Sequence, residues 1–470
     1  MNGLENLKPK KVFSFFLELC KIPHGSGNTK QISDFCVNFA KERGLFCLQD
    51  SLNNVIIKKD ATAGYENHPP VILQGHLDMV CEKEPDCDID FERDGLIVFE
   101  KDGFLAAKGT TLGGDDGIAV AMALAVLDSN DLAHPPLEAV FTVDEETGMY
   151  GAEGLDCSAL SGKLLINIDS EDEGVLTVGC AGGARAELSL PFPQSPLNEE
   201  CFTVTVSGLL GGHSGAEIDK GRLNSNRVLA EFLSSLPDFR LVDIEGGLKD
   251  NAIPARSVCT VFSKALSQKK SDEFVQKIKT ECDPDLNITV ESAGVCPLAA
   301  DEPLSRKAVD FLLTLPNGIQ ATSEDITGLV ETSLNLGILK TEKEKLCLSF
   351  AVRSSKNAQK TALLDKMETI AKRFGAEFST HGHYPAWEYR ECSRLRDTMS
   401  AAFENLYGRL PKISVIHAGL ECGLFCDKIE GLDAVSFGPD MADIHTPRER
   451  LSIASVERSY NYLCEILKRL

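Results

Sequence analysis

The chain has 470 residues, of which 43% are hydrophobic and 25% are charged, and its formal net charge at pH 7 is -23. This composition excludes an intrinsically disordered chain and is typical of a globular protein with two or three domains. The excess of negative charge opposes binding to nucleic acid or to an anionic membrane through a basic patch, so we expect neither as a partner.

The N-terminal part of the chain carries no sign of export. Residues 11–22 form an amphipathic pattern that Pro23 ends, which is typical of a helix rather than of a cleavable signal. The longest apolar run, residues 118–127, is too short to cross a bilayer. Sixteen cysteines lie without paired short spacings, so we expect reduced thiols and a cytoplasmic protein.

From residue 53 onward, strand-like and helix-like segments alternate. Such alternation predicts an α/β domain with a largely parallel sheet, in which ligands bind at the carboxyl ends of the strands. The segments in chain order are strands at residues 54–58 and 71–74, a helix after Gly117, and strands at residues 139–143, 163–168 and 175–178.

A second region, residues 185–387, interrupts this pattern. It begins after a glycine-rich turn and contains two rounds of strand and helix, which makes an internal duplication an open alternative. We expect an inserted domain there, with the first domain split into residues 1–184 and 388–470. The predicted segments are residues 202–207, 226–236 and 258–262 in the first round, and 303–313, 346–352 and 360–374 in the second.

Side chains that can hold a metal ion follow several of the predicted strands. His76 and Asp78 come after the strand at residues 71–74, and Asp169 follows the strand at residues 163–168. His445 follows an apolar segment late in the chain. These residues are expected to meet at one sheet edge.

Acidic residues reach the same edge at two places. Asp115 and Asp116 lie among glycines at the start of the helix, where one of them could instead act as an N-cap. Asp144, Glu145 and Glu146 end the strand at residues 139–143, where a solvated acidic turn is the alternative.

Together these side chains offer imidazole and carboxylate ligands, which suit zinc, cobalt or manganese. Two such ions that share a bridging carboxylate can polarise a carbonyl group and activate water. One residue of the Glu145–Glu146 pair could bind metal while the other acts as general base. Both can face one site only if the backbone turns there, as Thr147 and Gly148 permit.

The ordered set of motifs resembles the dinuclear-zinc aminopeptidase/carboxypeptidase family that includes the aminoacylases. The likeness extends from about Leu7 to the C-terminus and includes His417-Ala-Gly-Leu-Glu-Cys-Gly423. Each motif is weak alone, but their order is specific. The motifs are Gly-His-Leu-Asp, Leu-Gly-Gly-Asp-Asp-Gly, Asp-Glu-Glu-Thr-Gly, Asn-Ile-Asp-Ser-Glu, His-Ser-Gly and His-Thr-Pro.

The resemblance implies a mostly parallel-sheet zinc-peptidase catalytic domain interrupted by an inserted α+β lid domain. It implies that Asp115 bridges two metal ions. His76 and Asp169 would complete the first metal site, and Glu146 and His445 would complete the second. It further implies that Glu145 is the general base and later the proton donor, and that Asp78 orients His76.

In the inserted domain the resemblance implies three substrate-binding residues. His213 would stabilise the oxyanion, and Asn251 and Arg353 would hold the substrate, with Arg353 able to grip a carboxylate. A surface position for His213 and a local ion pair for Arg353 are the alternatives. Glu421 could line the pocket or support the fold.

The implied activity is metal-dependent hydrolysis of dipeptides with a free N-terminus, including Xaa-His (carnosine-like) dipeptides. Two divalent cations per chain are expected, with zinc first and cobalt or manganese as alternatives. Two other functions stay open, namely an N-acyl-amino-acid deacylase of the same fold and a catalytically silent metal- or peptide-binding relative. Family members can be dimers, so a homodimer is also an open alternative.

Overall fold

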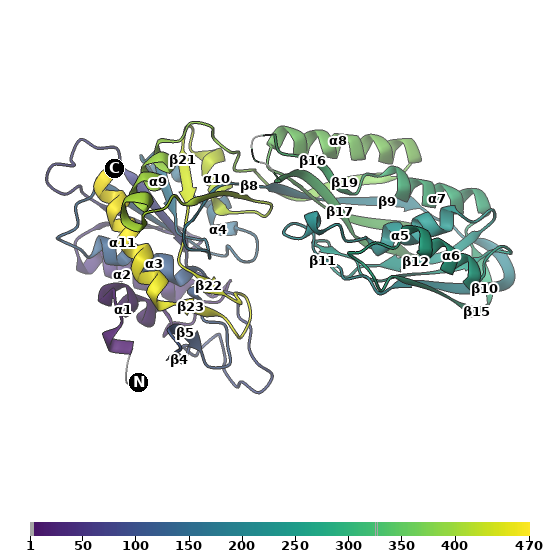
Figure 1. Cartoon of the computed structure of the whole chain (residues 1–470), viewed down its shortest axis with the longest axis horizontal. Coiled ribbons are helices and arrows are strands. Elements are labelled where there is room, and N and C mark those ends of the chain that lie inside the picture. Colours follow the sequence, from purple (N-terminus) through teal and green to yellow (C-terminus); the bar gives the residue numbers. More distant parts are fainter. Residues whose placement is uncertain (1–3, 325, 327) are drawn as a thin grey trace. The chain divides into compact units, whose positions relative to one another are not determined.

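The computed structural model describes residues 4–324, 326 and 328–470, and the chain divides into two compact units (Figure 1). Unit 1 comprises Met1–Gly179, Tyr389–Val415 and Leu420–Leu470. Unit 2 comprises Cys180–Glu388 and Ile416–Gly419. No helix in the described part of the chain combines the length and apolar character that a membrane crossing requires.

Unit 1 is built on a mixed eight-stranded sheet with the order β1-β2-β6-β3-β7-β21-β8-β20. The four central strands, β6, β3, β7 and β21, run parallel, whereas β1, β2 and β8 pair antiparallel with their neighbours. The predicted α/β fold is therefore confirmed, with its parallel strands confined to the centre of the sheet. The strands are β1 (Phe46–Gln49), β2 (Val55–Lys59), β3 (Val71–His76), β6 (Leu137–Thr142), β7 (Leu164–Asn167), β8 (Val175–Cys180), β20 (Lys412–Ile416) and β21 (Asp433–Ser436).

Helices cover this sheet because its central strands are buried along their whole length and need apolar partners on both faces. α3 packs on β3, and α9 and α10 pack on β21. A small sheet of β4 (Val98–Lys101), β5 (Phe104–Ala107), β22 (Met441–Ala442) and β23 (Arg450–Ser452) lies in the same unit. The helices are α1 (Lys10–Leu19), α2 (Lys30–Glu42), α3 (Gly114–Leu127), α4 (Tyr150–Gly154), α9 (Arg394–Tyr407), α10 (Glu421–Lys428) and α11 (Ile453–Arg469), with 3-10 turns η1 (Leu4–Asn6) and η2 (Cys157–Ala159).

Unit 2 contains a larger sheet with the order β15-β10-β14-β12-β17-β18-β9-β19, and β16 pairs with β17. Each strand of this sheet pairs antiparallel with its neighbours, and within the described residues β12 and β17 share two residue pairs, Glu245↔Lys340 and Gly246↔Leu339. The strands are β9 (Gly182–Pro191), β10 (Ser195–Ser207), β12 (Arg240–Gly246), β14 (Ser257–Phe262), β15 (Asn287–Ala299), β16 (Gly318–Thr322), β17 (Val330–Glu342), β18 (Lys345–Ser354) and β19 (Glu377–Tyr384).

Four helices pack against this sheet and enclose one hydrophobic core (Figure 1). The core is rich in Leu, Val and Phe from both helices and strands, including Phe232, Phe311 and Phe350. Unit 2 also contains the 3-10 turn η3 (Ile218–Lys220) and a short antiparallel pair of strands, β11 (Gly212–His213) and β13 (Ala252–Ile253). The helices are α5 (Ser225–Ser234), α6 (Gln268–Ile278), α7 (Glu302–Thr314) and α8 (Asn357–Phe374).

Candidate functional site

The parallel strands of unit 1 bring three chemically active segments to one edge of the sheet. Gln74 on β3 pairs with Val140 on β6 and with Asn167 on β7. Because these strands run in the same direction, the residues that follow them emerge at the same edge. His76, the turn that contains Glu145, and Asp169 therefore converge there.

Asp115 lies between two histidines from distant parts of the chain. Its Oδ1 lies 3.1 Å from Nε2 of His76, and its Oδ2 lies 3.1 Å from Nε2 of His445. The residue is only 8% exposed. Asp115 has non-helical φ and ψ at the start of α3, so its carboxylate is free to point away from the helix axis. Asp115 directs its carboxylate at the two histidines and Asp116 accepts the main-chain N–H of His76, so the alternative of either residue as a side-chain N-cap of α3 is not realised.

Three groups of ligand atoms lie close enough to share a cation. One consists of Asp115, Glu146 and His445, with Oε1 of Glu146 3.0 Å from Nε2 of His445. A second consists of His76, Glu145 and Glu146. The third group combines His76 with Asp116 and Asp169, and Asp169 brings in the segment that follows β7.

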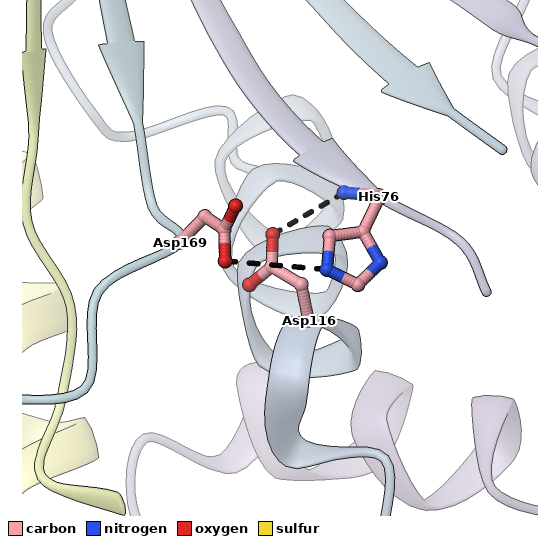
Figure 2. Close-up of side chains that lie close together, drawn as sticks. All are labelled: His76, Asp116 and Asp169. Atoms are coloured by element: carbon pink, nitrogen blue, oxygen red, sulfur yellow. Dashed lines mark hydrogen bonds and ion pairs between the residues drawn. The ribbon is translucent and has the colours of Figure 1, made fainter. Parts of the chain in front are cut away.

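Figure 2 shows this third group, in which Asp169 and Asp116 approach His76 from two directions. Oδ1 of Asp169 lies 4.0 Å from Nε2 of the His76 ring. Oδ2 of Asp116 instead accepts the main-chain N–H of His76 at 3.2 Å. The structure thus places a carboxylate oxygen of Asp116 near His76, in addition to those of the predicted ligands Asp115 and Asp169.

The Asp78 carboxylate organises the acidic turn. It is buried and accepts hydrogen bonds from the main-chain N–H of Glu145 at 3.1 Å, from that of Glu146 at 3.4 Å, and from the Ser26 hydroxyl at 2.7 Å. Nδ1 of His76 lies nearer to the main-chain oxygen of Asp78, at 3.0 Å, than to its carboxylate, at 3.5 Å. Asp78 therefore contacts His76 mainly through its backbone and the acidic turn through its side chain.

Burial and crowding of like charges shift the pKa values at this edge. Burial raises the pKa of Glu145 to about 8, and the neighbouring Glu421, Glu146 and Asp115 add to the increase while His76 opposes it. Burial lowers the pKa of His76, but hydrogen bonds to Asp115 and Asp78 outweigh it and raise the pKa well above the usual value. Hydrogen bonds to Asp115 and Glu146 raise the pKa of His445 to about 10. The acidic side chains and histidines are thus strongly coupled.

The donor atoms fit a pair of divalent cations. Oδ1 of Asp116 is buried and accepts no hydrogen bond, and the buried Oε1 of Glu146 has Nε2 of His445 beside it at 3.0 Å. Within residues 4–324, 326 and 328–470, no lysine or arginine forms an ion pair with Asp115, Glu146 or Asp169. Buried carboxylates without basic partners need another source of positive charge, and an imidazole and carboxylate set suits zinc.

Glu421, which the sequence left open as a pocket-lining or a fold-supporting residue, connects several strands at this edge. Glu421 is fully buried and accepts hydrogen bonds from Gln74 and Thr142, both at 2.6 Å, and Gln74 in turn accepts one from Asn167 at 2.6 Å. Glu421 thus ties together the strand ends that precede His76, the acidic turn and Asp169. The sequence signal for this network was the polar residue near the end of each otherwise apolar strand, namely Gln74, Thr142 and Asn167.

The loop between α1 and α2 was also missed as part of the site. In addition to the Ser26 hydroxyl, this loop contributes the main-chain N–H of Gly27, which donates to Oδ1 of Asp144 at 2.6 Å. Asp144, which had no predicted role, therefore anchors the acidic turn to this loop. The cluster His24-Gly-Ser-Gly-Asn28 was its only sequence signal.

In unit 2 the three predicted substrate-binding residues lie together. The main-chain oxygen of Asn251 accepts from Ser214 N–H at 2.8 Å, beside His213. A methyl group at Gly215 would lie 3.0 Å from Cε1 of His213 and 3.2 Å from Nε of Arg353. Nε of Arg353 is buried and has no hydrogen-bond partner, whereas Nη1 donates to the Tyr384 hydroxyl at 3.1 Å. Among the described residues no acid forms an ion pair with this guanidinium, so the alternative of a local ion pair is not realised.

The chain is similar to known peptidases over nearly its whole length. Cytosol non-specific dipeptidase of Escherichia coli is 36% identical over 485 residues, covering 100% of this chain and 99% of the relative. The crystal structure of aminoacylhistidine dipeptidase from Vibrio alginolyticus has a TM-score of 0.93 at 35% identity, covering 99% of this chain and 98% of that chain. Aminopeptidase PepT from Bacillus cereus has a TM-score of 0.57 at 16% identity, covering 98% and 99%, which is a likeness of fold.

These similarities confirm the predicted resemblance to aminoacyl-histidine dipeptidase (Xaa-His dipeptidase, peptidase D), and they support dipeptidase activity for this chain. Residues 72–469 match Peptidase family M20/M25/M40, and this range contains all the predicted site residues. Because the family model matches most of the chain and a relative is similar over its full length, the chain belongs to peptidase family M20/M25/M40.

Proposed function

We propose that the protein is a dinuclear metal-dependent dipeptidase that hydrolyses dipeptides with a free N-terminus, including Xaa-His dipeptides. The observation that carries this proposal is the position of Asp115, whose two oxygens each lie 3.1 Å from a histidine Nε2. A carboxylate with one oxygen directed toward each of two imidazoles suits a bridging ligand. His76 and Asp169 would complete one metal site, and Glu146 and His445 would complete the other.

Zinc is the first candidate metal, and cobalt and manganese are alternatives that a set of imidazole and carboxylate ligands can also hold. When bound, two divalent cations would polarise the scissile carbonyl and make water acidic enough to ionise near neutral pH. Glu145 would accept the proton of the attacking water and pass it to the leaving amine. Its pKa of about 8 would fall once cations neutralise the surrounding carboxylates, so that it can act as a base near pH 7.

His213, Asn251 and Arg353 are proposed to bind the substrate, and the inserted domain at residues 185–387 is proposed to act as a lid. Burial and the nearby Arg353 lower the pKa of His213, so the neutral ring would be available as a hydrogen-bond donor. The unpartnered Nε of Arg353 supports a role in binding the substrate carboxylate. The name of the Escherichia coli relative supports a cytoplasmic location, and a homodimer remains a prediction.

The decisive experiment joins a metal-content measurement to a substrate panel. Purified protein loaded with zinc, cobalt or manganese is incubated with carnosine-like and other dipeptides, and separately with acetylated amino acids. We expect about two metal equivalents per chain and turnover of the dipeptides. Turnover of only the acetylated amino acids would identify a deacylase instead, and metal binding without turnover of either set would identify a silent binding protein.

A further inference from the structure

Glu449 is a buried carboxylate that the proposed chemistry does not use. Its Oε2 accepts hydrogen bonds from Leu112 N–H at 2.7 Å and Gly113 N–H at 3.2 Å, and its Oε1 accepts one from Gly114 N–H at 2.7 Å. The residue is 3% exposed, and no lysine or arginine in the described ranges forms an ion pair with it. Three main-chain amides therefore compensate its burial.

These amides belong to the loop that delivers Asp115. Leu112, Gly113 and Gly114 immediately precede Asp115, and Gly113 has the left-handed φ of 66°. The fit is close, because a methyl group at Gly114 would lie 3.1 Å from Oε1 of Glu449. Glu449 thus fixes the backbone just before the residue that stands between the two histidines.

The main chain of Glu449 lies in the turn that follows His445. Its own N–H donates to the main-chain oxygen of Thr446 at 3.0 Å, which closes a turn that begins at the residue after His445. His445 itself has a left-handed φ of 58°. After Glu449 the chain enters β23, where Arg450 pairs with Ala106 on β5 and holds this turn against the small sheet.

We propose that Glu449 is a positioning residue that sets the separation between Asp115 and His445. One rigid side chain connects the backbone before Asp115 with the turn after His445, two segments 330 residues apart in sequence. Oδ2 of Asp115 and Nε2 of His445 lie 3.1 Å apart, and a small change in either loop would alter the distance over which both could hold one cation. The inference rests on the proposed dinuclear function.

The test compares Glu449→Gln and Glu449→Asp with the unaltered protein in a zinc titration that reports stoichiometry and stepwise affinity. Gln keeps the length of the side chain but turns one acceptor into a donor that faces an N–H group. Asp keeps the charge but cannot reach as far. We expect Glu449→Gln to lower the affinity of one zinc equivalent by about 10-fold or more, with the other changed less than about 3-fold, and Asp to have a smaller effect.

A matched control separates positioning from general stabilisation. Asp283 in unit 2 is also fully buried and accepts two main-chain N–H groups, from Leu210 at 2.9 Å and Leu223 at 2.7 Å. Asp283→Asn should lower thermal stability as Glu449→Gln does, yet leave both zinc affinities unchanged. The absorption spectrum of the cobalt-loaded protein should change for Glu449→Gln alone.

Two results would contradict the inference in different ways. If the unaltered protein binds two zinc equivalents and both Glu449 variants bind them with the same affinities, Glu449 is only a structural cap and the proposed function stands. If the unaltered protein binds fewer than two equivalents, the dinuclear function falls and the inference falls with it. Should Glu449→Gln fail to fold, the Glu449→Asp titration decides between these outcomes.

Discussion

Replacement of Asp78 by Asn tests whether this carboxylate acts mainly on the acidic turn. The side chain accepts three hydrogen bonds, from Ser26 Oγ and from the main-chain N–H groups of Glu145 and Glu146. Oδ2 serves both Ser26 and Glu146, whereas Oδ1 serves Glu145. An amide nitrogen in place of Oδ2 lets the Ser26 hydroxyl rotate and accept, but it leaves the Glu146 N–H facing a donor.

The size of the effect follows from this lost acceptor. A buried donor without a partner costs about 1–3 kcal/mol, so the free energy of unfolding should fall by about that amount. If the same displacement moves Glu145 away from its working position, kcat/KM should fall by about 10-fold to 100-fold, since each tenfold corresponds to about 1.4 kcal/mol. Ser26→Ala, which removes one donor and leaves no N–H unpaired, is the matched control and should have a smaller effect on both quantities.

Three measurements on Asp78→Asn decide the matter: chemical denaturation, metal content, and steady-state kinetics on a dipeptide. We expect lower stability, nearly full metal content and a lower kcat. Wild-type kcat combined with loss of one metal equivalent would refute this reasoning, because it would mean that the Asp78 side chain acts through His76. An unchanged stability would show that its hydrogen bonds to the turn are not significant.

The other predictions concern charge and metal. Glu145→Ala should retain both metal equivalents and lose turnover by about 100-fold to 10,000-fold, whereas Glu146→Ala should weaken metal binding; equal metal loss in the two would overturn their division of roles. Removal of metal by a chelator should lower the melting temperature in calorimetry, because bound ions stabilise the folded state and Asp115, Glu145 and Glu146 otherwise repel one another, and zinc should restore it. Burial and the nearby Arg353 lower the pKa of His417 to about 4. As the pH falls below about 6.5, His417 becomes protonated in the unfolded chain, whereas in the folded chain it stays neutral until about pH 4. The free energy of unfolding should therefore fall between about pH 6.5 and about pH 4, by up to about 1.4 kcal/mol per pH unit from this group. His417→Gln should flatten that part of the stability curve, and an unchanged slope would contradict the assignment.

The main elements of unit 1 could be predicted because their sequences carry strong local signals. β3, β6 and β7 are short apolar runs bounded by polar residues, and α3 follows a cluster of glycines. In unit 2, β17 was not predicted, since its buried sequence Val-Glu-Thr-Ser-Leu-Asn-Leu contains polar residues whose hydrogen-bond partners come from other segments of the folded chain. Asn335, for example, donates to the main-chain oxygens of Asp250 and Ala252.

For the candidate site, the sequence by itself determined which side chains could take part, because ligand-capable residues follow buried strands that must end at one edge of a sheet. Only the tertiary structure decided which atoms meet. The two oxygens of Asp115 are divided between His76 and His445, and the Asp78 carboxylate binds the turn of Glu145 and Glu146. Glu449 joins the loops that carry Asp115 and His445. These contacts join segments that are distant along the chain, and local residue preferences carry no information about the direction of a side chain once the segments have packed.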